Sequence, residues 1–121
     1  MNFRKAAAAM RALWVAGNEY MQASEPWKAM KTDPVRAGVA VRFALNLARV
    51  SALVGEPVIP AAAAKILKAL GETGTPAWPD PADDAVLDAL PTGQAITAPE
   101  ILFRQIEDAD LETWRERFSA G

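Results

Sequence analysis

Apolar residues recur every three or four positions over residues 3–22, which is the spacing of one face of an α-helix. This apolar stripe consists of Phe3, Ala7, Met10, Trp14, Gly17 and Met21, and it is widened by Leu13 and Tyr20. A polar stripe on another side consists of Arg4, Arg11, Asn18 and Gln22. Asn2 precedes the first turn, and an asparagine there accepts a hydrogen bond from a free backbone N–H. The pattern therefore predicts an amphipathic helix over residues 3–22 with Asn2 as its N-cap.

Prolines mark the starts of the following helices. Pro26 disfavours helical backbone at Glu25 and suits the first turn of a new helix. Asp33 followed by Pro34 is a second start signal of this kind, and Gly71 is a typical helix end. The predicted helices after the first cover residues 26–31, 34–54 and 60–70, and weaker patterns predict helices over 83–90 and 108–118.

The segment 34–54 is apolar on nearly all sides, and its polar exceptions Arg42, Asn46 and Arg49 share one edge. A helix of this composition is typical of the central, mostly buried member of a bundle. We expect Arg49 to bind a structural partner, either a carboxylate or a helix-end carbonyl.

No alternation of strands and helices occurs, and no internal repeat is present. Residues 72–82 are rich in proline and glycine and predict a loop, whereas residues 90–107 predict an irregular segment. The sequence thus predicts an all-α fold. It is a bundle of four or five helices forming a single domain over residues 1–121, with the irregular C-terminal segment packed across it.

The composition excludes much chemistry. The chain contains no cysteine and no histidine, so thiolate nucleophiles, disulfides, Cys/His zinc sites and histidine general bases are excluded. Asp83, Asp84 and Asp88 form an acidic cluster, and we interpret it as a solvated helix start favoured by the helix dipole. We expect neither a catalytic site, nor a metal, nor a cofactor. A cytoplasmic location fits the lack of cysteine, and no membrane span is expected because no long apolar run lacks charge.

Charge is distributed unevenly along the chain, although the net charge is only −2. Residues 1–68 carry ten Lys and Arg against four Asp and Glu, whereas residues 69–121 carry three against eleven. A basic half beside an acidic half favours an anionic partner on one face only, although uneven surface charge alone gives the same count.

The four tryptophans differ in their surroundings. Trp27 follows Pro26 directly and precedes Lys28 and Lys31, so it is either a core residue after a turn or a ring presented to a ligand. A rigid ring beside cations is suited to stacking on an unpaired nucleic-acid base. The other three have simpler predictions: a core position for Trp14, a loop anchor for Trp78 and a docked position on the last helix for Trp114.

Three segments together resemble methionyl-tRNA synthetases, in the helical domain that follows the catalytic core. The first matches N-x-Y-x-x-x-x-x-P-W-x-x-x-K through Asn18, Tyr20, Pro26, Trp27 and Lys31. The second matches N-L-x-R-V and a P-x-x-P turn through Asn46, Leu47, Arg49, Val50, Pro57 and Pro60. The third matches the closing motif through Leu90, Gly93, Ile96, Pro99, Leu102, Phe103, Ile106 and Glu107. These segments occur in the family's order and frame nearly the whole chain.

The resemblance implies a tRNA anticodon-binding domain, in which Trp27 stacks on an anticodon base and the partner is the anticodon stem-loop of methionine tRNA. Further RNA-binding candidates are Asn18, Tyr20, Lys28 and Lys31 beside Trp27, and Arg4 and Arg11 as phosphate contacts. The family's catalytic domain, with its histidine signature, has no counterpart here. The helix that supplies an Asn and an Arg for base reading is expected upstream of Met1. Catalysis is therefore expected from a synthetase domain in cis or in trans, and not from this chain alone.

An alternative remains open. A bundle that lacks one helix leaves an apolar groove, through which the chain could dimerise or dock on a catalytic subunit without binding RNA.

Overall fold

The computed structural model describes residues 2–74 and 76–119, and these form α-helices, one short 3₁₀-helix and loops without any strand. The helices are α1 (Phe3–Ser24), α2 (Pro26–Thr32), α3 (Pro34–Gly55), α4 (Pro60–Ala69), η1 (Asp84–Asp88) and α5 (Asp108–Ser119). The predicted all-α fold is confirmed, and the observed helix ends lie within two residues of the predicted ones.

The predicted helix over residues 83–90 is wrong in type, because η1 is a 3₁₀-helix that ends at Asp88. Pro91 disfavours helical backbone at Leu90, so a helix cannot continue through that position. Asp83 caps the short helix, since its Oδ1 accepts a hydrogen bond from the Ala85 N–H at 2.9 Å.

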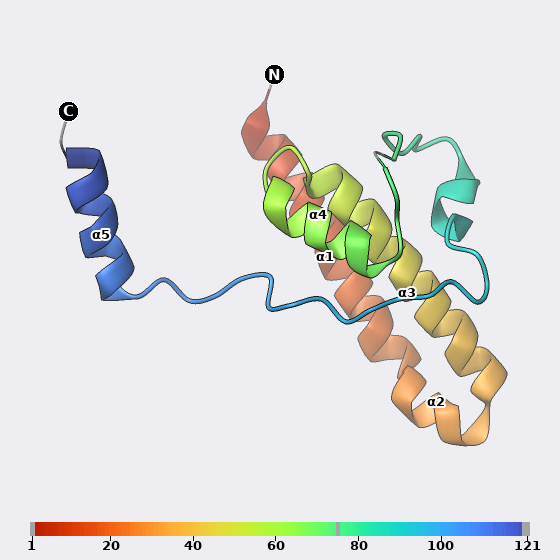
Figure 1. Cartoon of the computed structure of the whole chain (residues 1–121). Helices are drawn as coiled ribbons and strands as arrows, with labels where there is room; N and C mark the ends of the chain where they lie inside the picture. The colour runs from red at the N-terminus through yellow and green to blue at the C-terminus, as the bar shows by residue number, and fades with distance from the viewer. Residues whose placement is uncertain (1, 75, 120–121) are drawn as a thin grey trace.

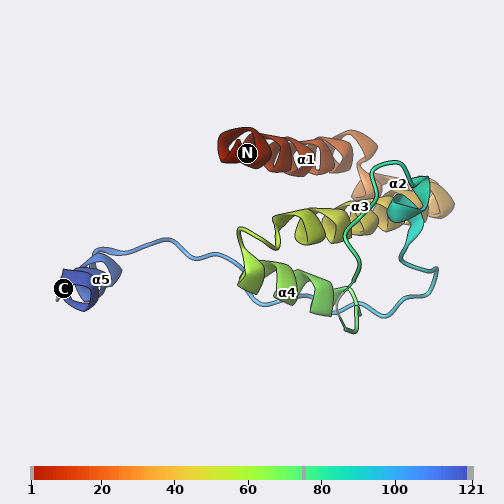
Figure 2. The same ribbon diagram turned by 90° about the horizontal axis from the view of Figure 1, so that it is seen from above.

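Helix α3 is the centre of the bundle. It packs against α1, α2, α4 and η1 (Figures 1 and 2). Small residues permit this close packing, because Ala37, Ala40 and Ala52 are all buried. The cap predicted at Asp33 is present, since its Oδ1 accepts a hydrogen bond from the Arg36 N–H at 3.1 Å.

The polar edge of α3 anchors the chain that follows α4. Asn46 is 0% exposed, and its Oδ1 accepts a hydrogen bond from the Leu90 N–H at 2.9 Å. The Arg42 guanidinium donates to the Leu90 carbonyl and pairs with Asp88. Arg49 pairs with the Glu72 carboxylate, which confirms the structural partner predicted for it. This edge is therefore a polar seam of the fold, which is buried at Asn46 and partly exposed at Arg42.

Helix α4 ends in a Schellman motif at Gly71, which has a φ of +79°. The Glu72 N–H donates to the Leu67 carbonyl and the Gly71 N–H donates to the Lys68 carbonyl, which satisfies the last carbonyls of the helix. The irregular segment then returns across this end, where the Thr97 N–H donates to the Ala69 carbonyl at 2.8 Å. A Cβ on Gly71 would lie 2.8 Å from the Ala95 carbonyl oxygen, so glycine is required there.

Helix α1 packs on α3 along one side only, and none of its residues is fully buried. Asn2 caps it as predicted, since its Oδ1 accepts a hydrogen bond from the Lys5 N–H. The core position predicted for Trp14 is wrong, because its side chain is 37% exposed. Its ring lies over Gly55, where a Cβ would be 3.5 Å from the Trp14 Cζ2. Trp14 thus forms the wall of a groove instead of filling a core.

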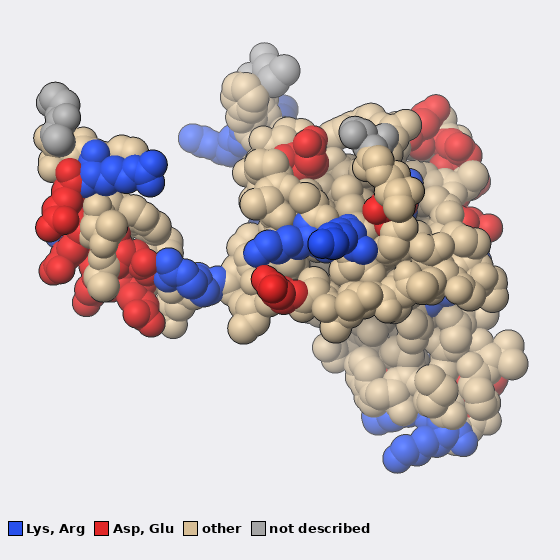
Figure 3. All heavy atoms as spheres, viewed as in Figure 1, with Lys and Arg blue, Asp and Glu red and all other residues tan. Residues whose placement is uncertain are grey.

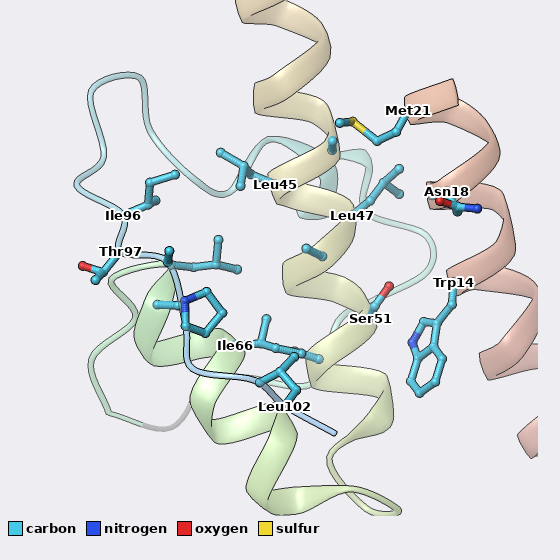
Figure 4. Close-up of a pocket in the computed structure, with 18 of the residues that line it drawn as sticks. Trp14, Asn18, Met21, Leu45, Leu47, Ser51, Ile66, Ile96, Thr97 and Leu102 are labelled. Carbon is cyan, nitrogen blue, oxygen red and sulfur yellow. The ribbon is translucent and has the colours of Figure 1, made fainter. Parts of the chain in front are cut away.

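That groove runs between α1, α3, α4 and the returning segment, and its volume is about 670 Å³. Figure 4 shows Trp14 and Met21 on its α1 side, Leu45 and Leu47 on α3, and Ile66 on α4. We call this cavity the α1–α4 groove.

Helix α5 stands apart from the bundle at the end of an extended segment in both views (Figures 1 and 2). The docked position predicted for Trp114 is wrong, because α5 has no buried residue and Trp114 is 39% exposed. Leu111, Trp114 and Phe118 form an apolar stripe on α5 that covers nothing else in the described chain. The loop anchor predicted at Trp78 is also wrong, since that side chain is 62% exposed.

The start of α5 is fixed by one ion pair. Arg104 donates two hydrogen bonds to the Asp110 carboxylate, at 2.6 and 2.7 Å. Asp110 also accepts a hydrogen bond from the Glu107 N–H at 3.0 Å, in the manner of a capping box. The hydrogen bonds from Arg104 and from Glu107 lower the pKa of the Asp110 carboxyl to about 2.

Among the described residues, one helix is long and apolar enough to cross a membrane by length and composition, and it is α3, with a mean hydropathy of 1.5. The same helix carries the paired arginines Arg42 and Arg49 and has neighbours on several sides. These features are those of the core helix of a bundle, which passes the same test.

Candidate nucleic-acid interface

The corner between α1 and α2 is made by a single residue. Glu25 has φ +42° and ψ +55°, and among the described residues it is the one non-glycine residue with a positive φ. Its N–H donates to the Met21 carbonyl and closes α1, while its own carbonyl accepts from the Lys28 and Ala29 N–H groups and opens α2. Glu25 is the single residue between the two helices, so its backbone sets the angle between them.

The next two residues point in opposite directions with respect to solvent. Pro26 is buried, as is Ala29 one turn later, so α2 is held against α3 by one face. Trp27 is 50% exposed and lies on the open side of α2. Half of the Trp27 surface is open to solvent while the adjacent Pro26 is held in the bundle, so Trp27 is not a core residue.

Two lysines follow Trp27 on α2. Lys28 and Lys31 lie on the same short helix, and both are exposed. Lys28 pairs with the Glu25 carboxylate at 2.8 Å, whereas Lys31 forms no ion pair within residues 2–74 and 76–119. Figure 3 shows basic side chains at the end of the molecule formed by α2 and also over α4 and α5, with acidic side chains over η1 and α5.

Tyr20 does not share this exposed site with Trp27. Its ring packs against Phe43 of α3, with ring centroids 4.8 Å apart and a tilt of 60°. The Tyr20 ring is therefore part of the α1–α3 contact, and the Ser24 hydroxyl donates to the Tyr20 carbonyl at 2.7 Å in the same turn. Its role is to hold the last turn of α1 beside the corner.

Asn18 lies on the wall of the α1–α4 groove with Trp14 and Met21, as Figure 4 shows. Among the residues of α1 that line this groove, Asn18 is the polar one. The structure thus brings Trp27, Lys28 and Lys31 together on α2 and places Asn18 on a different surface.

Arg4 and Arg11 are exposed on the N-terminal half of α1. Arg11 lies thirteen residues before Ser24, the last residue of α1, which corresponds to about 20 Å of helix. Neither arginine can contact the same nucleotide as Trp27, so any role for them is in binding phosphates elsewhere on an RNA.

The structure adds exposed apolar residues that the sequence did not single out. Met30, Val35 and Val39 border a second groove of about 540 Å³, closed on its other side by residues 90–94. The sequence predicted a mostly buried helix over 34–54 and did not mark Val35 or Val39 as exposed. Both are exposed because only α2 and the loop lie near that end of α3.

No group of acidic residues within the described chain is placed to hold a metal ion. Asp83 caps η1 and Asp88 pairs with Arg42, so two members of the acidic cluster have structural partners.

Comparison with known sequences assigns the family. The family described as the anticodon binding domain of methionyl tRNA ligase matches residues 1–121. The chain therefore belongs to the family of helical anticodon-binding domains, and within it to the domain of methionyl-tRNA ligases.

The relatives are methionine–tRNA ligases of bacteria. The protein of Dinoroseobacter shibae is 49% identical over 119 residues, which is 98% of this chain and 20% of the relative. The protein of Caulobacter sp. is 50% identical over 118 residues, or 98% of this chain and 21% of the relative. That of Hyphomonas neptunium is 48% identical over 126 residues, or 100% and 22%. The chain thus spans about a fifth of the length of these relatives.

Proposed function

We propose that this chain binds the anticodon stem-loop of methionine tRNA and that the Trp27 ring stacks on an unpaired base of the loop. The observation that carries the proposal is the half-exposed Trp27 ring on α2, fixed by the buried Pro26 and flanked by two exposed lysines. Stacking on an aromatic side chain contributes about 1–3 kcal/mol per base, and lysines add attraction to phosphate.

The other candidate residues would act on the RNA either directly or indirectly. Lys31 is positioned to contact a phosphate next to the stacked base, because it lies one turn from Trp27 and has no ion-pair partner among the described residues. Arg4 and Arg11 would attract phosphates of the stem. Asn18 and Tyr20 would act indirectly, through the groove wall and through the packing of α1 on α3.

The acidic C-terminal half is consistent with this arrangement. Of its eleven carboxylates, six lie on η1 and α5 and five on the loops after α4. Those on α5 stand away from the α2 end of the molecule (Figure 1), so they would repel RNA at Trp27 little. The chain matches only a fifth of its ligase relatives. We therefore propose that it carries no ligase activity alone and acts in the cytoplasm with a catalytic domain, in cis or in trans.

Fluorescence tests the stacking directly. In a variant with Trp14, Trp78 and Trp114 replaced by phenylalanine, Trp27 is the single indole. Addition of the stem-loop should quench its emission in a saturable manner, because a stacked base in direct contact with the excited indole quenches it by electron transfer. Saturable binding by an independent method without any change in Trp27 emission would contradict stacking.

A second candidate function is favoured by the apolar surface. The α1–α4 groove and the uncovered stripe of α5 are typical of protein-docking surfaces. The chain would then be an interaction module that joins a catalytic domain or a second copy. Sedimentation of the chain over a range of concentrations distinguishes the two functions, when combined with the RNA titration described in the Discussion.

A further inference from the structure

The charge beside Trp27 is partly neutralised by the residue that forms the corner. Glu25 does not cap α2 with its side chain; its carboxylate instead binds the Lys28 Nζ at 2.8 Å. Both side chains are solvent-accessible, so an RNA phosphate can reach them. Of the two lysines on α2, therefore, one is already paired with a carboxylate when no RNA is bound.

The choice of glutamate at this position is costly for the backbone. A left-handed conformation is unfavourable for a residue with a Cβ, and glycine or asparagine adopts it more readily. Strained residues persist where surrounding packing fixes them, and they gather at functional sites. Here the strain is held between the Tyr20–Phe43 contact on α1 and the buried Pro26 on α2.

We propose that Glu25 is a specificity-determining residue, which masks Lys28 and disfavours RNA that offers phosphate without a base for Trp27 to stack on. A phosphate that binds at Lys28 must displace the Glu25 carboxylate and lie beside its negative charge. An RNA that stacks a base on Trp27 has Lys31 for the neighbouring phosphate and need not displace Glu25, so it avoids this repulsion. Discrimination by a repulsive element of this kind lowers non-specific binding more than specific binding. The inference rests on the proposed RNA-binding function and adds a determinant to it.

The test compares Glu25→Gln with the parent chain, using a short DNA duplex as a generic polyanion whose paired bases cannot stack on Trp27, and the methionine stem-loop as the specific ligand. Removal of one charge about 5 Å from a phosphate in water should raise affinity for the duplex about three- to five-fold at low salt. The dependence of log K on log salt should steepen by about 0.9, the contribution of one phosphate contact on a DNA duplex. The preference for the stem-loop over the duplex should fall.

Two controls isolate the pair. Glu56→Gln makes the same change of charge at the far end of α3, a helix of 22 residues, so it should leave both affinities unchanged. Lys28→Ala in the Glu25→Gln background should abolish the gain, because the released lysine is its cause. Thermal unfolding of each variant, followed by circular dichroism, verifies that the fold is retained.

The outcomes separate this inference from the proposed function. If Glu25→Gln binds the DNA duplex neither more tightly nor with a steeper salt dependence, or if the gain persists without Lys28, the masking role is wrong. If instead the gain is as predicted but Trp27→Ala binds the stem-loop as well as the parent, the stacking role fails while Lys28 masking stands.

Discussion

At the scale of single residues, a few side chains and glycines fix the irregular parts of the chain. Asn46 binds the Leu90 N–H from inside the bundle, and Gly71 lets the segment at Ala95 approach the end of α4. Both residues join loops to helices, and neither touches the exposed face of α2. Substitutions at these positions should therefore change stability more than RNA binding.

Asn46→Ala should lower the free energy of unfolding by about 2–3 kcal/mol. The substitution leaves the Leu90 N–H buried without an acceptor, and an unsatisfied buried donor costs about 1–3 kcal/mol in addition to the lost packing. Urea unfolding monitored by circular dichroism measures the change. A loss below about 0.5 kcal/mol would show that the hydrogen bond does not anchor the loop.

Gly71→Ala and Gly74→Ala form a matched pair, because both glycines have a φ near +80°. At Gly74 an added Cβ meets nothing within 4 Å, so its cost is the backbone strain of about 1 kcal/mol. At Gly71 the Cβ also collides with the Ala95 carbonyl oxygen and the Gln94 side chain, so the loss should be about 2 kcal/mol larger. Equal losses in the two variants would contradict the close approach of the returning segment.

At the scale of elements, the sequence predicted local structure well because the signals are local. Caps and prolines at Asn2, Pro26, Asp33 and Pro60 define helix starts whatever the tertiary packing. Periodicity alone could not tell which apolar stripes find a partner. Trp14 and Trp114 both lie on well-formed stripes, yet one borders a groove and the other stands on an isolated helix.

The candidate site was predicted in the same partial manner. The adjacency of Pro26, Trp27 and the two lysines is a property of one short helix and could be predicted from sequence. The sequence placed Tyr20 on the apolar stripe and Asn18 on the polar stripe, but it did not predict that Asn18 lines a groove with Trp14 while Tyr20 packs on Phe43. The left-handed backbone of Glu25 also gave no signal, since glutamate is not a residue that favours it.

The start of α5 should depend on pH through Asp110. Its pKa is lowered from 3.8 to about 2, so the Arg104 clamp is fully formed above about pH 4 and is lost as the pH falls towards 2. The helical content of α5, measured by NMR chemical shifts at residues 108–112, should decrease over that range. In Asp110→Asn the content should already be reduced at neutral pH and should not change between pH 4 and 2. An unchanged helix start in the wild-type chain at pH 2 would show that the clamp is dispensable.

At the scale of the whole molecule, the chain exposes more surface than a compact protein of its size. Its accessible area is 9295 Å², whereas a compact monomer of 13.0 kDa exposes about 6,300 Å². The extended segment and the isolated α5 contribute to this excess area, because both stand away from the bundle (Figures 1 and 2). Exposed apolar surface of this extent supports the proposal that the chain packs on further protein.

The isolated chain should therefore self-associate as its concentration rises, and sedimentation velocity measures this association. The double substitution Leu111→Ser with Phe118→Ser should weaken association and leave thermal stability nearly unchanged, because α5 buries none of its residues. Glu112→Gln with Glu116→Gln is the control on the same helix. If the serine variant unfolds at a lower temperature instead, α5 packs on the bundle in solution.

The proposed stacking of Trp27 on an anticodon base is tested by a titration with the methionine tRNA anticodon stem-loop at near-physiological salt. The parent chain, Trp27→Ala and Trp78→Ala are compared on the native loop and on a loop with a changed anticodon. Trp78 is the matched control because it is a tryptophan of similar exposure outside α2. We predict that the native loop binds best, that Trp27→Ala loses about 1–3 kcal/mol of binding free energy and that Trp78→Ala loses none. Equal binding by all three proteins, or no discrimination between the loops, would contradict the proposed stacking.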